Sequence, residues 1–382
     1  MATELSLELQ GVWRTADSLH LAAVEIDLVL AILFAQHVTD QRRAVATESP
    51  GGIPARQPRR RVVHHGPFGL GCAPLGNLFQ AIDDGEASAL LEAAWDAGIR
   101  WFDTAPHYGL GLSERRLGAF LRTKPRQEYT VSTKVGRILV PYPSGAAERD
   151  PEGFDVPGDQ RRVWDFSGDG VRACLEASLE RLGLDSVDVA LIHDPSDHIE
   201  TAISEAYPAL AELRDAGSIQ TVGVGTRDTD VLKRFVNETD IDTVMLAGRF
   251  TLLDQSALTS LFPACLRRGV SVLNAGVFNS GVLASPLPAQ DSRFEYATAP
   301  SEVLVRARRI AQVCAAFGTT LPAAALAFAR QHPAIETVVV GAAHPGQLGE
   351  DIAWNSASPP QQLWEELVAQ GLLPFESLGP WG

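Results

Sequence analysis

A chain of 382 residues, 45% of them hydrophobic, is long enough to build one large barrel plus an extension around a sizeable core. Its 47 Asp and Glu residues outnumber its 32 Lys and Arg residues, and the net charge is −15. We therefore expect neither a nucleic-acid surface nor a membrane surface, because both would need clustered Lys and Arg. The oligomeric state stays open.

Residues 1–60 differ in character from the rest of the chain. The apolar stretch from Leu19 to Ala35 is interrupted by Glu25 and Asp27, so it is too short and too acidic for a membrane span. No basic segment precedes it, so we expect no signal peptide and take the cytoplasm as the default location.

A helix is predicted over residues 18–45, followed by the linker ESPGGIPARQPRRR. This N-terminal extension is interpreted either as a docking or dimerising helix, or as a peripheral appendage or translated upstream sequence without a role. We favour the last two.

From residue 61 to residue 382 we expect a single domain, in which short apolar runs alternate with helical patterns. The predicted strands are Gly69–Ala73, Arg100–Asp103, Thr130–Lys134, Val187–His193, Thr221–Gly225, Thr243–Ala247, Ser271–Ala275 and Thr337–Gly341. The predicted helices are 86–97, 113–122, 170–182, 200–216, 228–237, 256–268, 301–317, 322–331 and 347–354. Eight such units predict a parallel sheet closed into an α/β barrel of the (β/α)8 TIM type. An open doubly wound sheet is the alternative, but no GxGxxG follows the first strand.

A long loop, residues 136–168, leaves the predicted barrel just after Lys134. Connections longer than about 12–15 residues are usually functional or disordered. This one carries Tyr142, Phe154, Trp164 and Phe166, which disordered linkers usually lack. We interpret it as a partial lid over the substrate site; a floppy insertion is the alternative.

The stretch IRWFDTAPHYGLGLSERRLGAFL, residues 99–121, carries the strongest chemical signal. An apolar strand ends there at Asp103, and Tyr108 follows in the same loop. A Tyr has an ordinary pKa of about 10 and transfers protons near neutral pH only beside a cation that a carboxylate holds. Lys134, which ends the next strand, supplies that cation.

The segments FDTAPHYGLGLSERRLG, VSTKVGR and ALIHDP resemble the aldo-keto reductases, over about residues 68–358. These are (β/α)8 barrels that move hydride between a nicotinamide cofactor and a carbonyl or alcohol. The resemblance implies a catalytic group of Asp103, Tyr108, Lys134 and His193, with Tyr108 as general acid and base. Taken singly, each is better explained as a turn cap, a packing ring, a surface lysine or a buried histidine. Together, in these motifs, the catalytic interpretation prevails.

The same resemblance implies a cofactor site across the carboxyl ends of the strands, without a Rossmann turn. Two segments match the family's binding regions, VLNAGVFNSGVLA and VVVGAAHPGQLGEDI. The predicted cofactor-binding residues are Gly71, Asp103, Thr226, Phe278, Asn279, Ser280, Gly281, Gly341, Ala342, His344, Gln347 and Glu350. The predicted substrate-binding residues are His107 and Trp164.

Two departures from the family pattern bear on the cofactor. Members that prefer NADP place Lys or Arg beside the adenosine 2′-phosphate, where this chain has His344 and Gln347. Charge-assisted pairs supply most of that discrimination, so we expect a preference for NAD, or poor selectivity between NAD and NADP. Many members carry Ser-Asn where this chain has Gly225-Thr226, so we expect Thr226 to supply one hydroxyl to the nicotinamide amide and another group to share its recognition.

A narrower likeness lies in APLGNL, AGRFTLLDQ and NAGVFNSGVL. With the long loop, these resemble the aldose 1-dehydrogenase branch of the family and the related pyridoxal 4-dehydrogenases. That branch oxidises a cyclic hemiacetal to a lactone. The alternatives are a broad-specificity aldehyde or ketone reductase and a cofactor-binding regulatory subunit.

The four cysteines are Cys72, Cys174, Cys265 and Cys314. They form no CxxC pair, and their spacing matches no zinc site, so we predict no metal. Buried, reduced thiols are the simplest interpretation.

Overall fold

The computed structural model describes residues 66–379. The predicted N-terminal extension, with its helix over residues 18–45, lies outside the described residues and stays a prediction. So does the domain boundary at residues 60–61.

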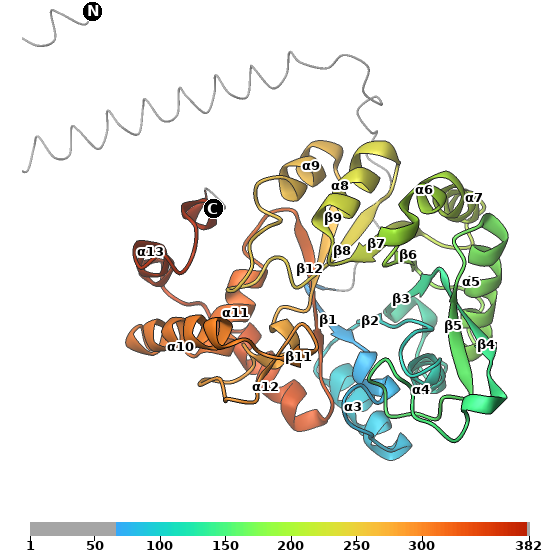
Figure 1. The fold of residues 1–382 in the computed structure, drawn as a ribbon, viewed down its shortest axis with the longest axis horizontal. Helices are drawn as coiled ribbons and strands as arrows, with labels where there is room; N and C mark the ends of the chain where they lie inside the picture. Colours follow the sequence, from blue (N-terminus) through green and yellow to red (C-terminus); the bar gives the residue numbers. More distant parts are fainter. Residues whose placement is uncertain (1–65, 380–382) are drawn as a thin grey trace, which may run out of the picture. The chain divides into compact units, whose positions relative to one another are not determined.

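Eight parallel strands close into a barrel, with helices around it (Figure 1). The strands are β1 (Phe68–Gly71), β2 (Trp101–Asp103), β3 (Thr130–Val135), β6 (Val189–His193), β7 (Thr221–Thr226), β8 (Thr243–Ala247), β9 (Ser271–Ala275) and β12 (Ile335–Gly341). Around the barrel they follow the order β1-β12-β9-β8-β7-β6-β3-β2. The predicted (β/α)8 architecture is confirmed, and all eight predicted strands are found.

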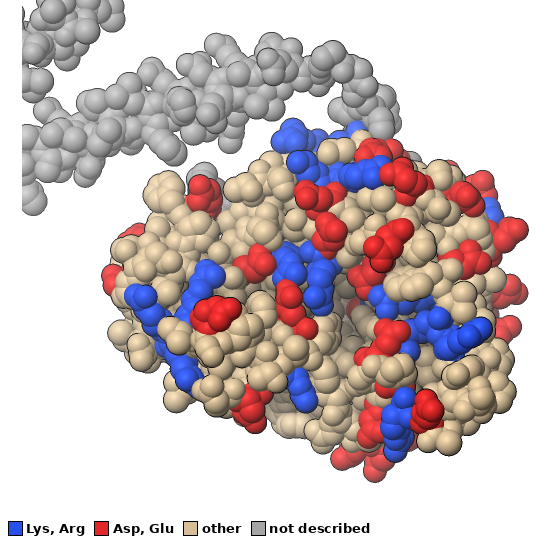
Figure 2. Space-filling model, viewed as in Figure 1, with Lys and Arg blue, Asp and Glu red and all other residues tan. Residues whose placement is uncertain are grey.

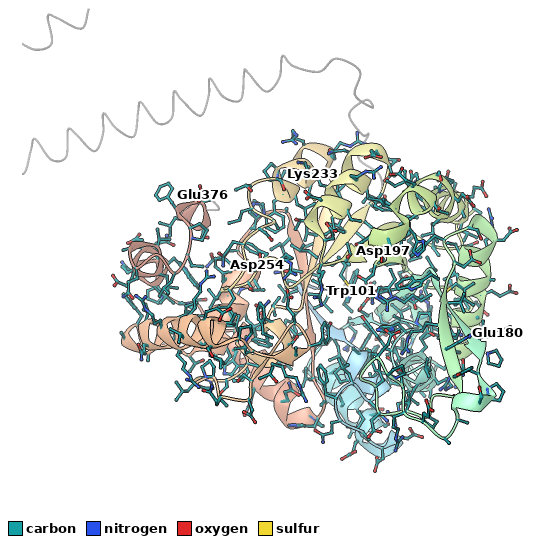
Figure 3. All side chains as sticks on the ribbon, in the orientation of Figure 1. Trp101, Glu180, Asp197, Lys233, Asp254 and Glu376 are labelled. Atoms are coloured by element: carbon teal, nitrogen blue, oxygen red, sulfur yellow. The ribbon has the colours of Figure 1, made fainter. Side chains whose placement is uncertain are left out.

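The strands read as continuous apolar runs because the barrel buries both of their faces. Every residue of β3 and β7 is buried, as expected for strands covered by helices outside and by packed side chains inside. The interior is filled by a cluster around Trp101, which lies near the middle of the barrel (Figure 3). Its other buried members are Val189, Leu191, Met245, Leu273 and Val339. These packed side chains close the barrel interior beneath the carboxyl ends of the strands.

The predicted helices are present with small shifts at most of their ends, and the helix Gln361–Ala369 was not predicted. The helices are α3 (Asp84–Asp96), α4 (Leu112–Leu121), α5 (Gly168–Leu182), α6 (Ile199–Thr201), α7 (Tyr207–Asp215), α8 (Thr229–Glu238), α9 (Leu261–Arg268), α10 (Ser301–Ala316), α11 (Leu321–Ala329), α12 (Pro345–Asn355) and α13 (Gln361–Ala369). Local capping sets many of these ends: Asp83 and Glu86 form a capping box at the start of α3. Between α6 and α7 the predicted helix 200–216 contains a π-helical stretch, Ala202–Ala206.

One predicted helix begins later than expected. The pattern over 256–268 predicted a continuous helix, but α9 starts only at Leu261. Before it, the side chain of Thr251 accepts hydrogen bonds from the N–H groups of Leu253 and Asp254, and Asp254 accepts one from Ser256. Such local side-chain bonds compete with helix formation.

The long loop over residues 136–168 contains regular structure. Strands β4 (Arg137–Pro141) and β5 (Gln160–Trp164) pair antiparallel as a hairpin. Its tip is tied to the segment after β1, because the N–H of Phe79 donates to Gly153 and the N–H of Asp155 donates to Asn77. The structure therefore disagrees with the floppy insertion and brings the hairpin to the barrel mouth.

A second hairpin, β10 (Arg293–Phe294) with β11 (Ala297–Thr298), follows β9 and was not predicted. Within residues 66–379 no single helix is long and apolar enough to cross a membrane. The bent pair α10 and α11, taken as one segment, has the length and composition of a membrane span. However, α11 is buried along its whole length.

Candidate active site

A cavity of about 920 Å³ opens at the carboxyl ends of the barrel strands. Each of the eight strands contributes a residue at or next to its carboxyl end: Gly71, Asp103, Lys134, His193, Thr226, Ala247, Ala275 and Gly341. This is the face on which (β/α)8 enzymes carry their active sites. On the face seen in Figure 2, acidic and basic side chains are interspersed around a central hollow.

Lys134 organises the middle of the cavity. Its ammonium donates to the Asp103 carboxylate at 2.7 Å, to the Thr104 carbonyl at 2.9 Å and to the Tyr108 hydroxyl oxygen at 3.1 Å. An ammonium has three protons, so all of its donors are used. The other oxygen of Asp103 accepts from the Ser132 hydroxyl at 2.7 Å, which fixes the carboxylate in turn.

The charge on Lys134 is secured by these contacts. Burial alone would lower the pKa of this lysine, but the neighbouring Asp103 and Tyr108 outweigh burial, so the pKa is raised above its ordinary value. Lys134 is therefore a permanent cation in the site, as the sequence predicted for a lysine held by a carboxylate.

Tyr108 behaves differently from the simple expectation. Lys134 does lower the pKa of Tyr108, but burial raises it more, and the result is a pKa of about 12. Lys134 thus lowers the pKa of Tyr108 as expected, but burial is the larger effect and was not foreseen from the sequence. Tyr108 is protonated at neutral pH, which suits a proton donor, and it needs alkaline pH or a bound cation to act as a base.

The backbone around Tyr108 depends on two glycines. A Cβ on Gly76 would lie 2.6 Å from the carbonyl carbon of Tyr108, and a Cβ on Gly109 would lie 2.3 Å from the Gly76 oxygen. Gly109 also has a φ of +61°. The segment after β1 and the loop after β2 can therefore pack backbone to backbone, which places the Tyr108 ring beside Lys134.

His193 ends β6 on the same side of the cavity. Its ring centroid lies 6.2 Å from that of Tyr108. Burial and the nearby Arg137 and Lys134 lower the pKa of His193 well below its ordinary value, so the imidazole is neutral. Its buried Nδ1 has no hydrogen-bond partner within the described part of the chain. The structure thus brings Asp103, Tyr108, Lys134 and His193 together.

The other half of the cavity is lined by small residues. Gly71, Gly225, Gly248, Gly276, Gly281 and Gly341 all face it. The predicted segment Phe278–Gly281 lines it too, and three successive residues there have positive φ, namely Asn279 (46°), Ser280 (61°) and Gly281 (107°). Such backbone permits a ligand to approach closely. The buried Oδ1 of Asn279 is unpartnered among residues 66–379. A glycine-lined site with this unpartnered oxygen is compatible with the predicted nicotinamide dinucleotide.

The last strand and α12 contribute only part of what was predicted. Gly341 and Gln347 line the cavity, but Ala342, His344 and Glu350 are not among its lining residues. The imidazole of His344 instead accepts from the Gln347 N–H at 3.1 Å and caps α12, while Gln347 Oε1 accepts from the Ala343 N–H at 2.9 Å. Thr226 does line the cavity, and its hydroxyl accepts from the Asp228 N–H at 3.3 Å.

The two predicted substrate residues have different positions. His107 lines the cavity, where its ring packs on Phe154 from the hairpin, with centroids 5.1 Å apart. Trp164 is 44% exposed and does not line the cavity. Its ring covers the guanidinium of Arg137 at 4.3 Å, and Arg137 does face the cavity. Trp164 can therefore affect a bound substrate only indirectly, by positioning the side chain of Arg137.

Sequence reasoning missed several polar residues of the cavity, among them Arg137, Glu152 and Asp194, and also Gln80, Arg227, Arg249, Glu295 and Tyr296. Arg137 follows Lys134 in the motif VSTKVGR, and Asp194 follows His193 in ALIHDP, so their neighbourhood was a usable signal. Glu152 lies within the hairpin, where no motif pointed to it.

Each cysteine is buried and free, as predicted. Among residues 66–379, no group of three or more His, Cys, Asp or Glu side chains is arranged to hold a metal ion.

Comparison with known proteins gives consistent results. The model of the aldo/keto reductase family matches residues 67–368. The chain is 49% identical over 314 residues to a D-threo-aldose 1-dehydrogenase of Pseudomonas sp., covering 80% of this chain and 94% of that protein. It is 37% identical over 323 residues to a pyridoxal 4-dehydrogenase of Microbacterium luteolum, with coverage of 80% and 94%. The solved structure of aldo-keto reductase AKR11C1 from Bacillus halodurans, in its holo form, superposes with a TM-score of 0.63 at 24% identity, covering 83% of this chain and 95% of that one. This last likeness concerns the fold alone.

Proposed function

This chain is an oxidoreductase of the aldo/keto reductase family, and on that premise we propose that it oxidises the cyclic hemiacetal of an aldose to a lactone. The observation that carries the chemistry is the contact of Lys134 with both Asp103 and Tyr108 at the mouth of the barrel. The choice of an aldose is supported by the 49% identity to a D-threo-aldose 1-dehydrogenase.

Tyr108 takes the proton of the anomeric hydroxyl in this proposal. Lys134 stabilises the phenolate that forms before or during the transfer, and Asp103 keeps Lys134 charged. His193 is neutral and lies beside Tyr108, so its ring donates a hydrogen bond that orients the same substrate oxygen. In the reductive direction Tyr108 donates the proton, as its raised pKa favours.

The family uses nicotinamide cofactors, and an oxidised nicotinamide would supply the hydride acceptor for the anomeric carbon. Gly71, Thr226 and the segment Phe278–Gly281, which line the glycine-rich part of the cavity, would hold it. We propose NAD as the preferred form. His344 caps α12, and Gln347 is uncharged, so neither supplies a permanent cation to a 2′-phosphate.

The test is reduced-nicotinamide absorbance with NAD⁺ and a panel of aldoses, including L-fucose, D-arabinose and L-galactose. Removing the Tyr108 hydroxyl in Tyr108→Phe should lower kcat by about 10²–10⁴-fold, the range that general acid–base groups contribute. Tyr142→Phe is the matched control, because Tyr142 is an exposed hairpin tyrosine outside the cavity lining. Full activity in Tyr108→Phe would contradict the mechanism.

A second candidate is a dehydrogenase of pyridoxal or a broad aldehyde reductase, which the 37% identity to a pyridoxal 4-dehydrogenase favours. Parallel assays with pyridoxal and NAD⁺, and with an aromatic aldehyde and NADPH, separate these functions. Reaction with those substrates but with no aldose would replace the sugar assignment while leaving the role of Tyr108 intact. Cofactor binding without turnover of any substrate would support a regulatory subunit instead.

A further inference from the structure

Four polar side chains line the cavity on the side of the β4–β5 hairpin, next to Tyr108 and His193 and away from the glycine-lined half. We call His107, Arg137, Glu152 and Asp194 the polar wall. They come from the loop after β2, from the start of β4, from the hairpin tip and from the end of β6. None of the four takes part in the proton transfer proposed above.

Arg137 is the centre of the polar wall. Its side chain is only 9% exposed, and its guanidinium donates to the Asp194 carboxylate and to His107 Nδ1 at 3.1 Å. An arginine has no acceptor, so His107 Nδ1 must accept, and the proton of the neutral ring must sit on Nε2. Burial, together with Arg137 and Arg162, lowers the pKa of His107 to about 2, so the ring stays neutral. His107 is thereby set as a donor through Nε2–H.

Glu152 retains acceptor capacity. Its carboxylate lies 3.6 Å from His107 Nδ1, 3.6 Å from Arg137 and 3.7 Å from Arg162, contacts too long for hydrogen bonds. Its side chain is 46% exposed. Nearby charges hold this carboxylate in place while its oxygens remain available to a ligand. Asp194, whose side chain is 39% exposed, likewise keeps an oxygen beyond the one that Arg137 occupies.

The hairpin places Glu152 through a buried anchor. Arg162 on β5 donates twice to Asp150, at 2.7 Å in each bond, and also donates to the His107 carbonyl at 2.7 Å. Side chains of Arg162 and Asp150 are 6% and 1% exposed. The anchor ties the hairpin tip, which carries Glu152, to the loop that carries Tyr108.

In and beside this part of the cavity, carboxylates outnumber cations. The cations are Lys134, Arg137 and Arg162, and the carboxylates are Asp103, Asp150, Glu152 and Asp194. Each cation is already paired with a carboxylate, so no surplus cation is left for an anionic substrate. A carboxylate or phosphate on the ligand would meet Glu152 and Asp194 instead.

We propose that Glu152 and Asp194 are specificity-determining residues that accept hydrogen bonds from two hydroxyl groups of an uncharged sugar, while His107 Nε2–H donates to a third oxygen. The substrate is then a neutral polyhydroxylated ring, and sugar acids and sugar phosphates are rejected. This inference rests on the proposed aldose oxidation. Carboxylate acceptors suit the task, because hydrogen bonds to charged groups are the strong ones and hydroxyl groups are good donors.

The experiment compares kcat/KM for three substrates of one configuration: the best neutral aldose found, its deoxy analogue lacking one ring hydroxyl, and its uronic acid. Wild type should prefer the neutral aldose over both others by about tenfold or more. Glu152→Gln removes the charge at constant shape, so its preference over the uronic acid should fall by about tenfold. Glu148→Gln is the matched control, since Glu148 is exposed on the same hairpin and does not line the cavity.

Glu152→Asp keeps the charge but withdraws it by one methylene. We expect this variant to lose its preference for the aldose over the deoxy analogue. It should still prefer the aldose over the uronic acid. Thermal melting reports whether each variant is folded. Aldose turnover with the wild-type preferences unchanged in both Glu152 variants would overturn this inference alone. Absence of aldose turnover by wild type would overturn the proposed function, and this inference with it.

Discussion

The ammonium of Lys134 lies 3.1 Å from the hydroxyl oxygen of Tyr108 while donating at 2.7 Å to Asp103. The three side chains come from the ends of two adjacent strands, β2 and β3, and from the loop that follows β2. The phenol is therefore coupled to a buried ion pair, and its protonation depends on that pair. The first prediction follows from this coupling.

Replacing Lys134 with Met should raise the pKa of Tyr108 further, because Lys134 is the group that opposes the effect of burial. Oxidation needs the phenolate, so its rate should rise with pH up to the Tyr108 pKa. In Lys134→Met, kcat for oxidation at pH 8 should fall by about 10²-fold or more, and the rising limb of the pH profile should move to higher pH. The measurement is kcat and kcat/KM for oxidation between pH 6 and 10.

The same variant leaves the Asp103 carboxylate buried without its cation. Breaking a buried pair in this way costs about 3–5 kcal/mol of unfolding free energy. The double variant Lys134→Met with Asp103→Asn should recover much of that stability in denaturant titrations, but none of the activity. Recovery of activity in the double variant would argue against a role for the Lys134 charge in the chemistry.

Substituting Gln347 with Arg should shift cofactor use toward NADP. Gln347 lines the cavity in the first turn of α12, where a 2′-phosphate would lie in the proposed NAD(P) site. One charge-assisted hydrogen bond is worth about 1.4 kcal/mol or more, so kcat/KM for NADP⁺ should rise about tenfold while that for NAD⁺ does not improve. Gln347→Met removes the amide without adding charge and is the control. A wild type that already prefers NADP would refute the premise.

Trp164→Ala should act on the substrate and not on the chemical step. The indole covers the Arg137 guanidinium at 4.3 Å and stacks on Phe166 with centroids 5.8 Å apart. A cation–π contact at a partly exposed site is worth about 0.5–1 kcal/mol, so KM for the sugar should rise about two- to fivefold with little change in kcat. Steady-state kinetics on the best aldose test this. Unchanged KM and kcat would contradict the interpretation that this part of the hairpin shapes the substrate site.

Asp351 should make the protein less stable as pH rises. It is 1% exposed, and neither carboxylate oxygen has a hydrogen-bond partner within residues 66–379. Burial, with a contribution from Glu350, raises its pKa from 3.8 to about 7. The folded state therefore holds a proton that the unfolded state releases, so stability falls between about pH 4 and pH 7 and stays reduced above it.

The variant Asp351→Asn removes this titration. Each pKa unit corresponds to about 1.4 kcal/mol, so Asp351→Asn should raise the melting temperature by several degrees at pH 8 relative to wild type and have little effect at pH 4.5. Glu365→Gln, which neutralises an exposed carboxylate on α13, is the control. A melting temperature that moves equally at both pH values would contradict the assigned cause.

Much of the architecture could be read from periodicity, because a parallel barrel buries both faces of every strand and so produces short, uninterrupted apolar runs. The runs ending at Asp103, Lys134 and His193 were placed to within two residues of their carboxyl ends. The hairpins β4–β5 and β10–β11 were not predicted, since their exposed residues carry no such signal. The late start of α9 was missed because Thr251 and Asp254 compete locally for the backbone.

For the candidate site, motif order along the chain was enough to nominate Asp103, Tyr108, Lys134 and His193, since strand ends of a barrel converge on one face. It was not enough to find the polar wall, because Arg137 and Asp194 follow adjacent strands whose pairing the motifs do not show, and Glu152 joins them only when the hairpin folds over the barrel mouth. Nor could it show that burial would outweigh Lys134 in setting the pKa of Tyr108. Sequence by itself determined which groups reach the catalytic face, because strand direction is a local property. Only the tertiary structure decided their partners, exposure and charge, because those depend on what residues distant in the chain place beside them.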